Sequence, residues 1–176
     1  MTPLSIPKSV TFPEAIALTQ TLLAQIAANQ LNEAEIEAIV SALVKRENGA
    51  RGFFVTYLTD ERSLADSPPQ AIIRALQTSP AIVSDLLVKN VAMSAAMAVT
   101  HRRNHNESME HSSRRVTRRT ATLIEQLKLT PVSSQLKQLQ ESLATESGDY
   151  QAFLQRWGYD SEQRQAIQNA LTTYRL

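Results

Sequence analysis

The sequence has no cysteine and very little glycine. Without cysteine, disulfide bonds, thiolate catalysis, cysteine-ligated zinc sites and iron–sulfur clusters are excluded. The four glycines are scattered along 176 residues and form no Gly-rich loop of the kind that binds phosphate. No GxSxG sequence or other nucleophile–base motif is present either. The commonest sequence signatures of an enzyme are therefore missing, and no cofactor is predicted.

Signals for secretion, membrane insertion and non-specific electrostatic binding are also missing. The first residues, MTPLSIPKSVTF, contain no apolar signal core and no Ala-x-Ala cleavage site. Spanning a bilayer takes roughly 20 consecutive apolar residues, and no stretch here is that long without interruption, so we expect no membrane span. The net charge is only +1, which steers the whole chain neither to nucleic acid nor to a membrane. We expect a cytoplasmic protein.

The most apolar stretch of the chain is residues 81–100, AIVSDLLVKNVAMSAAMAVT. Within residues 91–99 only Ser94 is polar. A helix that is apolar on all sides must be buried by its neighbours or by lipid. We therefore predict that residues 81–100 form a buried central helix, with Met93 and Ala96 inside the protein.

Helix-capping patterns stand at the start of several other segments. A cap residue with Glu or Gln three positions later occurs at 11–14, 32–35 and 160–163. The pair Asn48-Gly49 follows one periodic apolar segment and is expected to stop its helix. These patterns favour an all-helical protein.

Residues 50–59, ARGFFVTYLT, are the one segment with a strand-like composition, rich in aromatic and β-branched residues. No other stretch of the chain has the pattern of a strand. An isolated strand would leave its backbone groups without hydrogen-bond partners. We therefore predict a buried helix or helical turn for these residues.

The predicted fold is all-α. Residues 1–10 form an extended N-terminal arm, and residues 11–176 form a single-domain bundle of about seven or eight helices around the central helix, 81–100. No glycine or proline lies within residues 81–128, so this stretch is either one long helix or two.

The strongest functional signal is a cluster of arginines after the central helix. Residues 101–119 carry six arginines and two glutamates, a charge of +4 with neutral histidines, while the rest of the chain carries −3. On a helical wheel the four arginines of SSRRVTRR, 112–119, fall within an arc of roughly 140°, apart from the apolar residues. We therefore predict one exposed, arginine-rich helix face. The candidate residues for binding an anionic partner are Arg102, Arg103, Arg114, Arg115, Arg118 and Arg119.

Guanidinium groups bind carboxylates and phosphates through forked pairs of hydrogen bonds. An acidic protein partner, nucleic acid, and simple solvation with local pairs such as Glu110 with Arg114 are all compatible with the cluster. Nucleic acid has less support, because no aromatic residue lies in the cluster to stack on bases. No helix-turn-helix, zinc-finger or RNA-binding signature accompanies it.

Three histidines lie in the same region. His101 and His105 are four residues apart and could both reach one metal ion from a continuous helix, and His111 follows them. The HExxH zinc motif is absent because Arg102 follows His101. On a helix His105 would also lie on the same side as Met109, which suits a histidine packed against apolar residues. Metal binding by these histidines is therefore an alternative to burial, and no metal ligand is assigned.

Aromatic residues near the end of the sequence form a stripe. Tyr150, Phe153 and Trp157 are spaced i, i+3 and i+7, so a helix would place them on one face, whereas Tyr159 lies beyond Gly158 and need not share it. Such a stripe indicates core packing or a contact between subunits. A homo-oligomer is therefore compatible with the sequence.

The leading hypothesis is a non-enzymatic interaction or regulatory module that presents the arginine-rich face to an acidic partner. The second is a nucleic-acid-binding protein that uses the same face. The third is a metal-binding protein or an enzyme centred on His101, His105 and His111.

Overall fold

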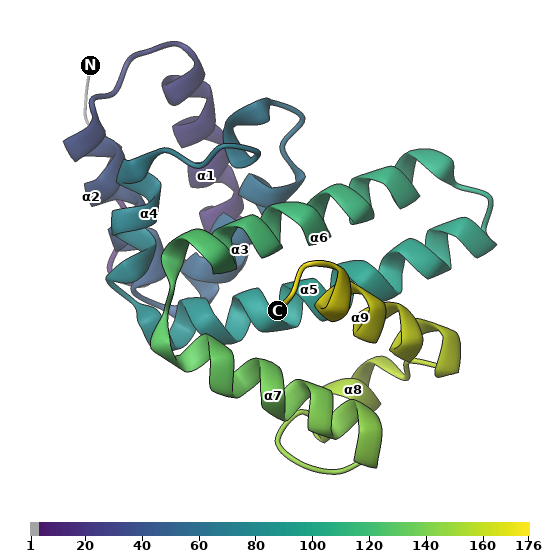
Figure 1. Cartoon of the computed structure of the whole chain (residues 1–176). Coiled ribbons are helices and arrows are strands. Elements are labelled where there is room, and N and C mark those ends of the chain that lie inside the picture. Colours follow the sequence, from purple (N-terminus) through teal and green to yellow (C-terminus); the bar gives the residue numbers. More distant parts are fainter. Residues whose placement is uncertain (1–3) are drawn as a thin grey trace. The chain divides into compact units, whose positions relative to one another are not determined.

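The computed structural model of the chain describes residues 4–176, and its regular structure is entirely helical (Figure 1). No strand occurs in this part of the chain, so the prediction of an all-α fold is confirmed, including the helix predicted for residues 50–59. The elements in chain order are α1 (Phe12–Ala27), α2 (Glu33–Val44), α3 (Glu47–Thr59), the 3₁₀ helix η1 (Ser63–Ala65), α4 (Gln70–Gln77), α5 (Pro80–Arg103), α6 (Glu107–Leu127), α7 (Thr130–Thr145), α8 (Gln151–Trp157) and α9 (Ser161–Thr173).

The helices divide into two compact units, residues 1–86 and 87–176. Helix α5 begins in the first unit and continues into the second. The single domain predicted for residues 11–176 stays a prediction. Of the predicted arm, residues 4–10 contain neither helix nor strand, and residues 1–3 lie outside the described residues.

The first unit packs α1 against α3 and α2 against α4. The capping boxes predicted for the first two helices are present: Thr11 accepts from the Glu14 backbone N–H, and Asn32 accepts from that of Glu35. Each cap satisfies a backbone donor that the first turn of a helix leaves without a partner. Helix α1 approaches α3 closely at Gly52, where an added Cβ would lie 2.4 Å from the Cβ of Ala15.

The prediction that Asn48-Gly49 stops a helix is wrong. Helix α2 ends at Val44, and both residues lie in the first turn of α3. Gly49 is required there for space: an added Cβ would lie 2.0 Å from the carbonyl oxygen of Leu43. A glycine that permits close backbone approach has the same appearance in the sequence as a glycine that ends a helix.

In the second unit α5 and α6 run antiparallel, joined by a short turn (Figure 1). The buried hydroxyls of Ser94 and Thr117 hydrogen-bond across the pair at 2.8 Å. Residues 81–128 therefore form two helices, and the break occurs without glycine or proline. His105 makes the turn in the left-handed conformation, with φ of 52°, and Asn106 caps the start of α6.

Helix α5 is largely buried, with an open stripe along one side. Ala96 is completely buried, as predicted. Met93 is only half-buried and Met97 is 39% exposed, so the prediction that residues 91–99 have no solvent-facing side is wrong. The two residues are four apart and share one side of the helix.

Helix α5 is also long and apolar enough to cross a membrane, since its most apolar 18 residues have a mean hydropathy of 1.5. The length argument against a span therefore does not hold for the helix as it forms. Of that window 61% is buried inside the protein, and the core helices of soluble proteins pass the same test. The expectation of no membrane span stays a prediction.

Candidate partner-binding site

The six arginines predicted to bind a partner lie on two helices of the second unit. Arg102 and Arg103 are in the last turn of α5, and Arg114, Arg115, Arg118 and Arg119 are on α6. Arg102, Arg103, Arg114 and Arg118 are exposed, and Arg115 is intermediate.

Arg119 is not part of an exposed face. Its side chain is only 1% exposed and is the largest of the fully buried side chains. The prediction that all four arginines of α6 lie on an exposed face is therefore wrong for this residue. On the helical wheel Arg119 is about 40° from Leu123, which is completely buried, so the edge of the arginine arc turns into the core.

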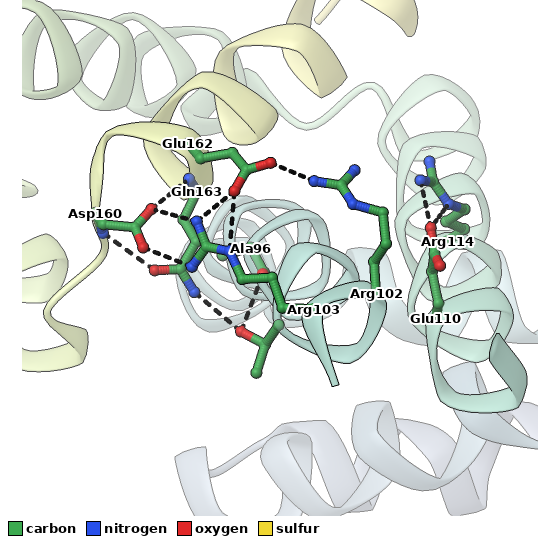
Figure 2. A network of polar contacts seen from close by, with 9 residues as sticks. Ala96, Arg102, Arg103, Glu110, Arg114, Asp160, Glu162 and Gln163 are labelled. Carbon is green, nitrogen blue, oxygen red and sulfur yellow. Dashed lines mark hydrogen bonds and ion pairs between the residues drawn. The ribbon is translucent and has the colours of Figure 1, made fainter. Parts of the chain in front are cut away.

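Arg103 holds two carboxylates at once (Figure 2). Its Nη1 donates to Asp160 Oδ2 at 2.6 Å and its Nη2 donates to Asp160 Oδ1 at 3.2 Å, a forked pair. Its Nε donates to Glu162 Oε2 at 2.9 Å, and Nη2 donates to the same oxygen. Arg102 donates through Nη2 to the other oxygen of Glu162, which lies between the two guanidinium groups.

We call Arg102 and Arg103 the arginine pair, and Asp160 and Glu162 the acidic pair. The two pairs come from the end of α5 and the beginning of α9, 57 to 60 residues apart in the sequence. All four side chains remain accessible, with exposed fractions between 42% and 49%. The network therefore lies at the surface of the second unit.

Asp160 has a second role as the N-cap of α9. Its Oδ1 accepts from the backbone N–H of Gln163 at 3.0 Å, and the Gln163 side chain accepts from the backbone N–H of Asp160. The hydrogen bonds from Arg103, with those of the cap, lower the pKa of Asp160 to about 2. The carboxylates of the acidic pair in turn raise the pKa of Arg103.

A neutral hydrogen bond joins the same two helices. The side-chain amide of Gln163 donates to the hydroxyl of Thr100 at 3.0 Å. Because this bond does not involve the carboxylates, α9 keeps one direct tie to α5 that does not depend on charge.

The sequence interpretation missed the acidic pair. Asp160 was assigned as a helix cap, which is correct, and the capping pattern gives no sign that its other lone pairs bind arginine. The one available signal was the charge of −3 outside residues 101–119, which shows that carboxylates are in excess elsewhere without indicating which of them lie near the cluster.

Arg114 is paired within its own helix. Its Nε and Nη2 both donate to Glu110 Oε1, at 3.0 and 2.6 Å, in the i, i+4 pair expected from the sequence. Its side chain is 59% exposed, whereas that of Glu110 is 15% exposed. Arg115 and Arg118 also make interactions within the chain.

The three histidines are spread over two helices and the turn between them. His101 is in the last turn of α5, His105 is in the turn, and His111 is on α6. The continuous helix assumed for His101 and His105 is therefore absent. His105 and Met109 are both exposed, so the packed alternative is wrong as well. Among the described residues no group of three or more His, Cys, Asp or Glu side chains could hold a metal ion.

The aromatic stripe is only partly formed. The Phe153 ring contacts those of Tyr150 and Tyr159 edge to face, each at a centroid distance of 6.3 Å. Trp157 is 51% exposed, so the stripe is not packed along its whole length, and Tyr159, which need not have shared the face, contacts Phe153. Burial raises the pKa of Tyr159 to about 12.

A groove of about 880 Å³ runs between α6, α7 and the end of α9 in the second unit. Its lining includes Ile124, Val132 and Leu136 and none of the three histidines or six arginines predicted as site residues. The groove therefore adds nothing to the case for histidine-based catalysis.

A family model for uncharacterised conserved protein UCP020893 matches residues 11–174. The chain belongs to this family. The match includes both compact units, but the family's description names no activity. No curated protein and no solved structure matches the chain.

Proposed function

We propose that the protein is a non-enzymatic interaction module that binds an acidic segment of a partner protein with the exposed arginines of α5 and α6. The observation that carries the proposal is the geometry of Arg103, which already holds the carboxylates of Asp160 and Glu162. Forked guanidinium–carboxylate contacts of this kind are what an acidic partner would make.

Accessibility supports the proposal. The side chains of Arg102, Arg103 and Arg114 are between 42% and 59% exposed, so a partner can reach each guanidinium group. Exposed ion pairs contribute only about 0–1 kcal/mol to stability. A partner's carboxylates can therefore replace the internal ones at little cost to the fold.

The same pairing makes nucleic acid the weaker candidate. Three of the exposed arginines, Arg102, Arg103 and Arg114, are matched within the second unit by the three carboxylates of Glu110, Asp160 and Glu162. Nucleic-acid binding is driven by a local excess of positive charge that neutralises phosphates and releases counterions. Local neutralisation reduces that excess, whereas an acidic protein segment can still bind by exchange.

The proposal is tested by fluorescence anisotropy with a labelled peptide of repeated Asp-Ser-Glu, and with the same peptide made neutral as Asn-Ser-Gln. We expect the purified protein to bind the acidic peptide only. Random-sequence duplex DNA should not compete, and added salt should weaken binding. In the variant Arg114→Glu/Arg118→Glu, which reverses two charges beside Arg102 and Arg103, binding should be clearly weaker and the melting temperature nearly unchanged.

The matched control is Lys128→Glu/Lys137→Glu, which makes the same charge change at two exposed lysines of the same unit. We expect this control to bind the acidic peptide as the parent does, apart from a small long-range effect that salt removes. Equal losses in both variants would show that the effect is one of net charge alone. Strong competition by DNA would favour the nucleic-acid alternative.

A further inference from the structure

The acidic pair has the features of a bound ligand. Asp160 is the N-cap of α9 and Glu162 is the second residue of that helix, so two carboxylates two positions apart meet two consecutive arginines. Both oxygens of Asp160 and both oxygens of Glu162 accept from the arginine pair. An acidic segment of another protein could satisfy the same donors with the same spacing.

We propose that Asp160 and Glu162 are an internal ligand that occupies the arginine pair, and that an acidic partner binds by displacing them. The partner chemistry is a segment with two carboxylates two residues apart at the start of a helix or in a turn. This inference rests on the proposed function, and it adds Arg102 and Arg103 as the place of binding and the acidic pair as its inhibitor.

The structure favours exchange at this place. The contact joins residues 57 to 60 positions apart, so no local chain geometry forces the carboxylates to stay. The cap of α9 uses the backbone N–H of Gln163, and the Gln163 amide also binds Thr100. After displacement, α9 therefore keeps its N-terminal cap and its neutral tie to α5.

The Arg114–Glu110 pair is an internal comparison (Figure 2). Both residues are on α6, one turn apart, and the Glu110 side chain is 15% exposed against 49% for Glu162. A carboxylate held on the same helix surface cannot move far from its arginine. We therefore place displacement at the arginine pair and not at Arg114.

An internal ligand lowers the apparent affinity for an external one. If the acidic pair occupies the arginines nine-tenths of the time, the apparent dissociation constant is about tenfold larger than the intrinsic value. Removing the two internal charges should therefore strengthen partner binding by about tenfold. A purely structural ion-pair network predicts no gain.

The test uses the full chain with Asp160→Asn/Glu162→Gln. Asparagine is as good an N-cap as aspartate, so α9 should remain capped. The probe is the labelled Asp-Ser-Glu peptide, measured by fluorescence anisotropy in parallel with circular dichroism. We expect binding about tenfold tighter than the parent's, with unchanged helicity.

The matched control is Glu141→Gln/Glu146→Gln, which removes two exposed carboxylates of α7 and its C-cap and so changes the net charge equally. This control should bind like the parent. A third variant adds Arg102→Gln/Arg103→Gln to Asp160→Asn/Glu162→Gln. This variant should lose the entire gain in peptide affinity.

The outcomes separate the two proposals. If the parent binds the peptide and Asp160→Asn/Glu162→Gln shows no gain beyond its matched control, the internal-ligand proposal is overturned and the interaction module stands. A gain that survives removal of the arginine pair also overturns it. If neither the parent nor any variant binds the peptide, the interaction module fails and the internal ligand fails with it.

Discussion

At the scale of single residues, arginines close together in the sequence have different surroundings. Arg118 is exposed, whereas Arg119, the next residue, is only 1% exposed. One step along a helix rotates the side chain by about 100°, which is enough to move it from solvent into the core. The charge of +4 over residues 101–119 therefore overstates the positive surface that a partner meets.

The first prediction is that Arg119 supports stability and not binding. Arg119→Ala removes a fully buried side chain, and we expect it to cost on the order of 3 kcal/mol of unfolding free energy. Arg118→Ala, at the exposed neighbour, should cost less than about 1 kcal/mol. Urea denaturation of both variants measures the difference. Similar small losses in both variants would show that the Arg119 side chain contributes nothing to the core.

The second prediction concerns Asp160 and acid. Its folded pKa of about 2 lies below the ordinary value of 3.8, so its pairing contributes stability above about pH 4 and loses that contribution as the pH falls towards 2. Asp160→Asn lacks this titration. We expect the parent to be more stable than the variant at pH 7, and the gap to close between pH 4 and 2 in urea titrations. A gap that stays constant over that range would contradict the pairing with Arg103.

At the scale of elements, local capping signals were the reliable part of the sequence. Thr11, Asn32 and Asp160 each cap a helix, because a capping box is a contact between residues three positions apart. The sequence leaves open whether residues 81–128 form one helix or two, because the turn between α5 and α6 uses His105 in a left-handed conformation and not glycine. Gly49 was misassigned because its role is set by Leu43, a residue in the preceding helix.

The third prediction tests the close approach of α1 and α3. Gly→Ala in an exposed helix stabilises a protein by up to about 1 kcal/mol. At Gly52 the added Cβ would lie 2.4 Å from the Ala15 Cβ, so we expect Gly52→Ala to destabilise by about 1–3 kcal/mol. A lower melting temperature for Gly52→Ala would therefore support the close approach of α1 and α3, and a higher one would contradict it.

A double-mutant cycle identifies the cause of that loss. Ala15→Gly removes the side-chain atom that Gly52→Ala would meet, and the double variant should recover part of the loss. Recovery should be incomplete, because backbone atoms of Ala15 and Ile16 lie 3.0 Å from the same added Cβ. Strict additivity of the two single changes would contradict a direct contact.

At the scale of the whole molecule, the candidate site depends on long-range pairing. The arginine pair was identified from sequence by residue type alone, and its partners are 57 to 60 residues away. No local pattern encodes such a contact, because it depends on how the helices of the second unit pack. Composition could therefore predict a cluster of positive charges. How far carboxylates from elsewhere in the chain neutralise that cluster could be seen only in the folded structure.

The last prediction is that the chain unfolds in one cooperative transition. The boundary between the two units falls between Leu86 and Leu87, within the continuous helix α5, and not in a loop. Helix formation is cooperative, so loss of α5 in one unit should unwind its continuation in the other. Leu43 in the first unit and Leu139 in the second are both completely buried. We expect Leu43→Ala and Leu139→Ala each to lower the free energy of unfolding of the whole chain by about 2–5 kcal/mol, and so to shift the same single transition. Scanning calorimetry should show equal calorimetric and van't Hoff enthalpies for the parent and for both variants. Two resolved transitions, with only one shifted by each change, would mean that residues 11–176 are two domains that share a helix without sharing stability.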